Sequence, residues 1–132
     1  MSAGNTYENK ILDAMLGVPA DGVAETYYAA LFTVAPTDST SGTEVSGGSY
    51  ARVAIANNAT NFPAASSGSK ANGVAITFPT STGSWGTVVA WGLFDASSGG
   101  NLCFYGSVSP NVAVGSGVAP SFPIGSLTIT CD

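Results

Sequence analysis

The sequence contains no histidine, and this absence bears first on catalysis. Histidine is the side chain that most readily carries a proton near neutral pH. Without it, a serine or cysteine nucleophile would depend on Lys10 or Lys70, which we expect to lie in solvated positions. The carboxylates available for acid–base chemistry are scattered along the chain: Asp21, Asp38, Glu44 and Asp95. We therefore expect no enzymatic activity.

Charged residues are scarce as well. They make up 8% of the chain, against roughly 25% in an average soluble protein. The 3 Lys and Arg are outnumbered by 8 Asp and Glu, which excludes the basic surface that nucleic-acid binding requires. A surface with so few charges is poorly protected against self-association. The composition therefore favours a protein that works inside an assembly.

Cysteine occurs twice, as Cys103 and Cys131, which is too few for a zinc site in a chain without histidine. We expect two half-buried thiols in neighbouring strands. A disulfide between them is geometrically possible if the last strand pairs beside the hairpin described below, although a reducing compartment would keep it open. Asp38 and Glu44 do not have the spacing of a calcium loop. We expect no metal ion and no cofactor.

Long hydrophobic runs are also missing. No apolar stretch approaches the ~20 residues that a membrane-spanning helix needs. Ser2, Gly4 and Asn5 stand where a signal peptide would carry its basic and apolar regions. We expect synthesis in the cytoplasm and no contact with a membrane.

Aromatic and β-branched residues concentrate in residues 76–106, which hold both tryptophans. Thr87–Asp95 and Leu102–Val108 have strand composition, and the glycine-containing segment Ala96–Asn101 between them predicts a hairpin. Alternate side chains of the first strand point to opposite faces, and neither face is polar. Such a strand is either central in a two-layer fold or covered by a partner chain.

The remaining chain predicts further short strands separated by polar loops. These strands are Thr26–Val34, Tyr50–Ala56, Val74–Phe78, Val118–Pro123 and Gly125–Asp132. Two long loops, Thr37–Ser49 and Asn57–Gly73, separate them. With the hairpin and a short piece at Val112–Val114, about seven strands at regular spacing indicate an all-β fold, an antiparallel β-sandwich or a small barrel. For Arg52, a salt bridge to a nearby carboxylate is favoured over a ligand clamp.

The N-terminal residues predict a short amphipathic helix. Asn5–Thr6 resembles a helix cap, and Gly17 is placed to end the helix. We therefore divide the chain into an N-terminal helical arm, residues 1–20, and an antiparallel β domain, residues 21–132. The apolar face of the helix would dock on its own sheet or on a neighbouring subunit. The candidate contact residues on that face are Tyr7, Ile11, Leu12, Met15 and Leu16.

Several short segments, taken together, resemble a family of small structural proteins of tailed bacteriophages and prophages. They are Leu31–Thr33, Pro36–Thr37, Gly42–Val53, Ile76–Pro79, Gly83–Val88, Gly92–Ala96, Gly99–Leu102 and Gly125–Ile129. The resemblance covers nearly the whole chain. It implies a place in the virion, either on the head or in the tail and its fibres, and it brings no catalytic residues.

The leading hypothesis is a capsid decoration or cement protein. It would assemble as a homotrimer in the host cytoplasm, bind the major capsid protein at the outer capsid surface and stabilise the head through buried apolar area. The alternative is a tail or fibre-associated module that contacts a host glycan through exposed aromatic side chains such as Tyr27, Tyr28 or Trp85. A third hypothesis, a cell-envelope hydrolase, requires paired carboxylates in a cleft.

Overall fold

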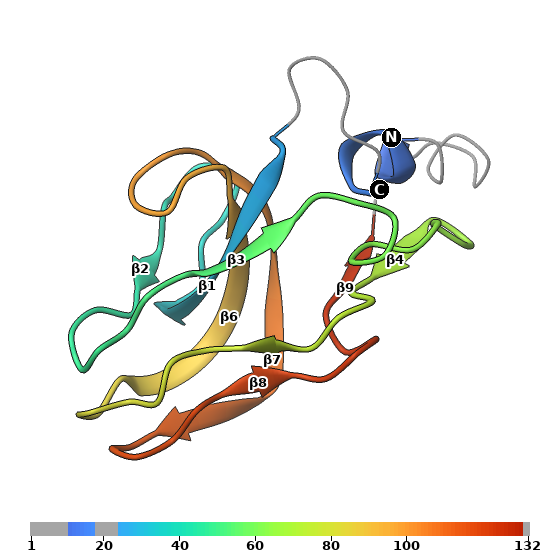
Figure 1. Cartoon of the computed structure of the whole chain (residues 1–132). Helices are drawn as coiled ribbons and strands as arrows, with labels where there is room; N and C mark the ends of the chain where they lie inside the picture. Colours follow the sequence, from blue (N-terminus) through green and yellow to red (C-terminus); the bar gives the residue numbers. More distant parts are fainter. Residues whose placement is uncertain (1–10, 18–23, 131–132) are drawn as a thin grey trace. The chain divides into compact units, whose positions relative to one another are not determined.

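The computed structural model describes residues 11–17 and 24–130. Nine strands lie in these residues, and Figure 1 labels them in chain order. Their bounds are β1 Thr26–Val34, β2 Thr43–Glu44, β3 Val53–Ala56, β4 Ser69–Ala71, β5 Ile76–Thr77, β6 Gly86–Phe94, β7 Leu102–Val114, β8 Ser121–Phe122 and β9 Thr128–Thr130. The strand pairs with a determined register are antiparallel, and within residues 11–17 and 24–130 helix is confined to one short segment. The predicted all-β class is therefore confirmed.

The chain forms two compact units. Unit 1 comprises Met1–Tyr27, Ile55–Ile76 and Phe122–Asp132, and unit 2 comprises Tyr28–Ala54 and Thr77–Ser121. The chain passes between the units within β1, β3, β5 and β8. The predicted division between residues 20 and 21 falls in 18–23, outside the described residues.

The main sheet of unit 2 has the order β2-β1-β6-β7, and β3 also pairs with β1. The predicted hairpin is confirmed as β6 and β7. Strand β7 runs beyond the expected Val108 and passes through Pro110, where its register with β6 shifts. Proline is tolerated there because β7 is the last strand in this order and need not donate on both sides. Within the described residues the sheet is open, since β2 and β7 end the order rather than pairing with each other.

Strand β6 is covered on both faces. Val88 and Leu93 are at most 2% exposed and Trp91 is 5% exposed. Trp91 lies opposite Gly106 of β7, where a Cβ atom would come within 2.7 Å of the indole ring. A glycine is therefore needed beside the indole. On the other face, Ala90 belongs to a core cluster with Ala30 and Phe32, against which Val89, Phe94 and Leu102 pack. Of the two predicted explanations for a strand without a polar face, the central position is correct.

In unit 1, β4 pairs with β9. Leu127 and Ile129 are buried and Thr128 and Thr130 are exposed, as the alternation predicts. Cys131 lies outside the described residues, so its predicted inward position and its pairing with Cys103 stay predictions.

The helical segment also belongs to unit 1. Residues 11–15 are helical, and the amide of Leu16 donates to the carbonyl of Leu12 at 2.9 Å. Gly17 follows with φ of 102°, a left-handed conformation that suits glycine at a helix end, as predicted. The predicted cap at Asn5–Thr6 lies outside the described residues. Among residues 11–17 and 24–130, no helix has the length and hydrophobicity that a membrane crossing needs.

The two predicted loops contain short strands that the sequence analysis missed. β2 lies within Thr37–Ser49, and β4 lies within Asn57–Gly73. A strand of two or three residues is too short to show an alternating pattern, and its pairing depends on partners far away in the sequence. Phe62, at the middle of the second loop, is 1% exposed and forms part of the core.

Candidate functional site

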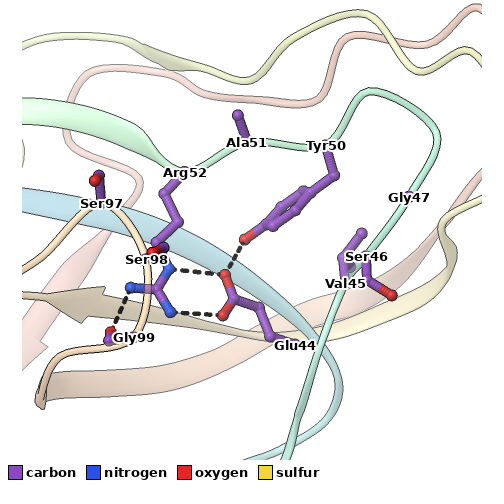
Figure 2. A pocket seen from close by; sticks show the side chains of 10 residues that line it. All are labelled: Glu44, Val45, Ser46, Gly47, Tyr50, Ala51, Arg52, Ser97, Ser98 and Gly99. Atoms are coloured by element: carbon purple, nitrogen blue, oxygen red, sulfur yellow. Dashed lines mark hydrogen bonds and ion pairs between the residues drawn. The ribbon is translucent and has the colours of Figure 1, made fainter.

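A cavity of about 470 Å³ in unit 2 is built around three polar side chains. Figure 2 shows Glu44 of β2 facing Tyr50 and Arg52, which precede β3. We call these three residues the Arg52 cluster. The remaining lining comes from neighbouring loop residues: Val45, Ser46, Gly47, Ala51, Ser97, Ser98 and Gly99.

Arg52 and Glu44 form a bidentate ion pair. Nη2 of Arg52 lies 2.7 Å from Oε1 of Glu44, and Nε lies 2.9 Å from Oε2. The hydroxyl of Tyr50 donates to the same Oε2 at 2.7 Å and accepts from the amide of Leu31 at 3.1 Å. The parallel bonds of a guanidinium to a carboxylate fix both side chains. The salt bridge predicted for Arg52 is confirmed.

The guanidinium also holds the loop between β6 and β7. Its Nη1 donates to the carbonyls of Ala96 and Gly99, each at 2.8 Å, and its Cζ lies 3.6 Å from the centre of the Phe94 ring. The Arg52 side chain is 7% exposed. One residue therefore ties β2, the segment before β3 and the hairpin loop together by charge-assisted bonds and a cation–π contact.

The protonation states follow from this geometry. Burial alone would raise the pKa of Glu44, but the hydrogen bonds from Arg52 and Tyr50 and the guanidinium charge hold that pKa below its ordinary value. Burial and the hydrogen bond to Glu44 raise the pKa of Tyr50 far above its ordinary value. The hydrogen bond to Glu44 raises the pKa of Arg52. All three shifts favour the ordinary charge states near neutral pH, an ionised Glu44, an ionised Arg52 and a neutral Tyr50.

In unit 1, Lys70 is buried in an ion pair, so the predicted solvated position is wrong. Its side chain is 1% exposed, and Nζ lies 2.6 Å from Oδ1 of Asp13, whose side chain is 40% exposed. The same oxygen accepts from the amide of Ala65 at 2.7 Å. A buried ammonium needs such a partner. This pair could not be predicted from a local pattern, because Asp13 and Lys70 are 57 residues apart.

We expect Asp13→Asn to lower the free energy of unfolding by about 1–3 kcal/mol, less than for a fully buried pair because Asp13 is partly exposed. The hydrogen bond from Lys70, and then that from Ala65, lower the pKa of Asp13 from 3.8. The wild type is therefore more stable than the variant by the full amount above pH 3.8, the ordinary pKa of aspartate. This difference in the free energy of unfolding disappears as the pH falls through the folded-state pKa of Asp13. Urea unfolding at several pH values measures it. An advantage that persists unchanged at about pH 2 would contradict the assignment.

The predicted contact residues of the helix lie in different environments. Leu12 and Leu16 are at most 1% exposed, whereas Ile11 is 45% exposed. Met15 is half-buried, and its carbonyl accepts from Tyr27 Oη at 3.0 Å and Asn57 Nδ2 at 3.1 Å. Tyr7 lies outside the described residues. Residues 11–17 thus dock on unit 1 itself, while a role of this face toward a partner stays a prediction.

Two of the three aromatic residues expected to be exposed are buried. Tyr27 is 1% exposed and packs edge-on against Phe62. Trp85 is 4% exposed, packs edge-on against Tyr50, and donates from Nε1 to the carbonyl of Gly48 at 2.9 Å. Tyr28 is half-buried. Long polar loops cover these rings, and that coverage is not visible in a local sequence pattern.

Two buried asparagines in unit 1 were also missed. Asn57 is 3% exposed, donates from Nδ2 to the carbonyls of Met15 and Ala24, and accepts from the amide of Gly17. Asn72 is 2% exposed and uses its side chain in the same way, toward residues 74, 123 and 127. Asparagine in a polar glycine-rich segment usually indicates a turn. The sequence pattern therefore predicts exposed positions for these two side chains.

Asp38 and Asp95 each bind a different partner within unit 2. Asp95 accepts from the amide and side chain of Asn101 within the hairpin loop, and Asp38 accepts from Tyr105. Asp21 lies outside the described residues. In the part of the chain that the structure describes, no group of three or more His, Cys, Asp or Glu side chains is arranged to hold a metal ion.

A model of a protein family described as "Podophage GP4 fiber I protein gp80" matches residues 2–130. A comparison with curated proteins found no match. The family match covers nearly the whole chain and agrees with the resemblance to phage structural proteins; its description names a fibre and not the head. The chain therefore belongs to the podophage fiber I protein gp80 family and is a structural protein of a phage virion.

Proposed function

We propose that this protein is a tail or fibre-associated structural component of the virion that contacts the host surface. The observation that carries the proposal is the family match over residues 2–130, because the family is described by a fibre protein. The same description gives no support to decoration of the capsid surface. We therefore prefer the fibre hypothesis to the decoration hypothesis.

The polar groups of the structure support a structural role without catalysis. In the Arg52 cluster, both carboxylate oxygens of Glu44 and three guanidinium nitrogens of Arg52 are bonded within the chain. Lys70 and Asp13 are likewise bonded within the chain, to each other. A nucleophile needs a neighbouring base that activates it, and a general base needs a free lone pair within reach of the substrate. These side chains instead stabilise loops, so we propose that the protein is not an enzyme.

We further propose that the protein self-associates, as a homotrimer, through the outer edge of β7. This strand has 13 residues and no charged side chain among them. It ends the sheet order of unit 2, and Val112 on it is 42% exposed. Charged side chains are a common protection against pairing of edge strands. Their absence here favours pairing with another strand, as the low overall charge predicts.

Gold-labelled antibodies against the chain, applied to intact virions, test the location. We expect the label on the tail or its fibres. Particles that lack the protein give the background. Label distributed over the head would overturn the fibre proposal and return the decoration hypothesis.

A further inference from the structure

Unit 2 has a second cavity, of about 450 Å³. None of its lining residues also lines the cavity at the Arg52 cluster. One wall is the loop Thr37, Asp38, Ser39, Thr40 and Ser41, and the other comes from Leu102, Cys103 and Tyr105 of β7. Its volume is within the ~300–1,000 Å³ of small-ligand sites. The lining combines one aromatic ring, one carboxylate and four hydroxyl-bearing side chains of the loop.

The loop wall is held in place by its own hydrogen bonds. The amide of Thr37 donates to the carbonyl of Thr40 at 2.9 Å, and the two threonine hydroxyls are 2.7 Å apart. The amides of Ser39 and Thr40 donate to Oγ1 of Thr37 at 3.3 and 3.1 Å. A loop ordered in this way loses little conformational entropy when a ligand binds. Its exposed hydroxyls can both donate and accept.

Tyr105 provides the aromatic surface of this cavity. It is 41% exposed, unlike Tyr27 and Trp85, and its hydroxyl donates to Oδ1 of Asp38. That bond, made to one of the two carboxylate oxygens of Asp38, fixes the tilt of the ring. An aromatic face beside hydrogen-bonding groups suits a ligand with one apolar face and a rim of hydroxyls. A saccharide ring has this character.

The charge of the site selects among saccharides. The chain has three basic residues, of which Arg52 and Lys70 are in ion pairs elsewhere and Lys10 lies outside the described residues. No described cation lines the cavity, while Asp38 contributes a carboxylate. An anionic sugar would meet repulsion there without a compensating charge. A neutral sugar can instead donate its hydroxyls to the carboxylate.

We propose that the cavity between residues 37–41 and Tyr105 binds a neutral saccharide. The inference rests on the proposed fibre function, since a fibre meets the saccharides of the host surface. The saccharide proposal and the fibre proposal can be overturned independently. Saccharide binding is measured on the isolated chain, whereas the location of the protein is measured on the virion.

The test is titration of the full chain with soluble oligomers of glucose, galactose and N-acetylglucosamine, and with matched oligomers of uronic acids. Isothermal calorimetry and NMR shifts of residues 37–41 and 105 report binding. We expect saturable binding of at least one neutral oligomer with a Kd of about 1 mM, and weaker binding of the acidic ones. Absence of saturable binding by every neutral oligomer, or tighter binding of the acidic ones, would overturn the proposal.

Three variants locate the site. Tyr105→Ala should weaken binding about tenfold because it removes the ring. Tyr105→Phe keeps the ring and should retain most of the affinity. Val112→Ala is the matched control, since Val112 is equally exposed on β7 but does not line the cavity. Equal affinity of the Tyr105→Ala and Val112→Ala variants would show that the saccharide binds elsewhere and overturn the assignment.

Discussion

Replacing Asn72 by aspartate should lower the free energy of unfolding by about 3–5 kcal/mol, because it buries a charge without a partner and reverses two hydrogen bonds. Nδ2 of Asn72 donates to the carbonyls of Val74 and Pro123 at 2.8 and 3.0 Å, and Oδ1 accepts from the amide of Leu127 at 2.9 Å. Aspartate has the same shape but would turn an oxygen toward both carbonyls. The side chain is 2% exposed, so water cannot screen the repulsion.

Urea unfolding followed by circular dichroism measures this loss. Asn111→Asp is the matched control, because it makes the same change at an exposed position of β7 and should alter stability by less than about 0.5 kcal/mol. Hydrogen exchange of the variant should increase first in β4 and β9, whose segments Asn72 joins. Equal stability of the two variants would mean that Asn72 does not organise unit 1.

Arg52→Met should be the second most damaging change, lowering the free energy of unfolding by about 2–4 kcal/mol. The variant loses the bidentate pair with Glu44, both bonds to the hairpin loop and the contact with Phe94. It also leaves the Glu44 carboxylate, 25% exposed, without its counterion. We expect faster hydrogen exchange in the loop between β6 and β7, which Arg52 holds.

Comparison variants separate the charge from the packing. Arg52→Lys should recover only part of the loss, since an ammonium cannot make the bidentate pair. Adding Glu44→Gln to Arg52→Met should be less harmful than the sum of the single changes, because no orphan charge remains. A strictly additive double variant would contradict the ion-pair explanation.

The same pair gives a pH dependence with a definite sign. The folded-state pKa of Glu44 is held below its ordinary 4.5. The contribution of ionised Glu44 to the free energy of unfolding is therefore fully present above pH 4.5. It is lost as the pH falls through the folded-state pKa of Glu44. Without Arg52, burial raises the pKa of Glu44, so the variant protonates at higher pH. The stability difference between wild type and Arg52→Met should narrow in acid.

The sequence predicted those parts of the fold whose patterns are local. Strand β1, the hairpin of β6 and β7, the alternation of Leu127 and Ile129 and the end of the helix at Gly17 each follow from side-chain period or turn chemistry within a few residues. The salt bridge of Arg52 was also expected, because a lone arginine in a strand needs a counterion.

Long-range partners were not predictable in the same way. Lys70 and Asn72 look like residues of a solvated glycine-rich loop until Asp13 and Leu127 are brought against them. Tyr27 and Trp85 look available for a ligand until loops cover them. In each case burial depends on contacts between segments more than 30 residues apart, and no single window of the sequence contains both sides of such a contact.

The most direct test of the central claim, that this chain is a fibre-associated structural component, is its copy number in purified virions separated into heads and tails. Gel densitometry gives the copy number from the intensity of the band of this protein relative to that of the major capsid protein. We predict a few copies per particle, all in the tail fraction. Hundreds of copies in the head fraction, or none in the particle, would contradict the account.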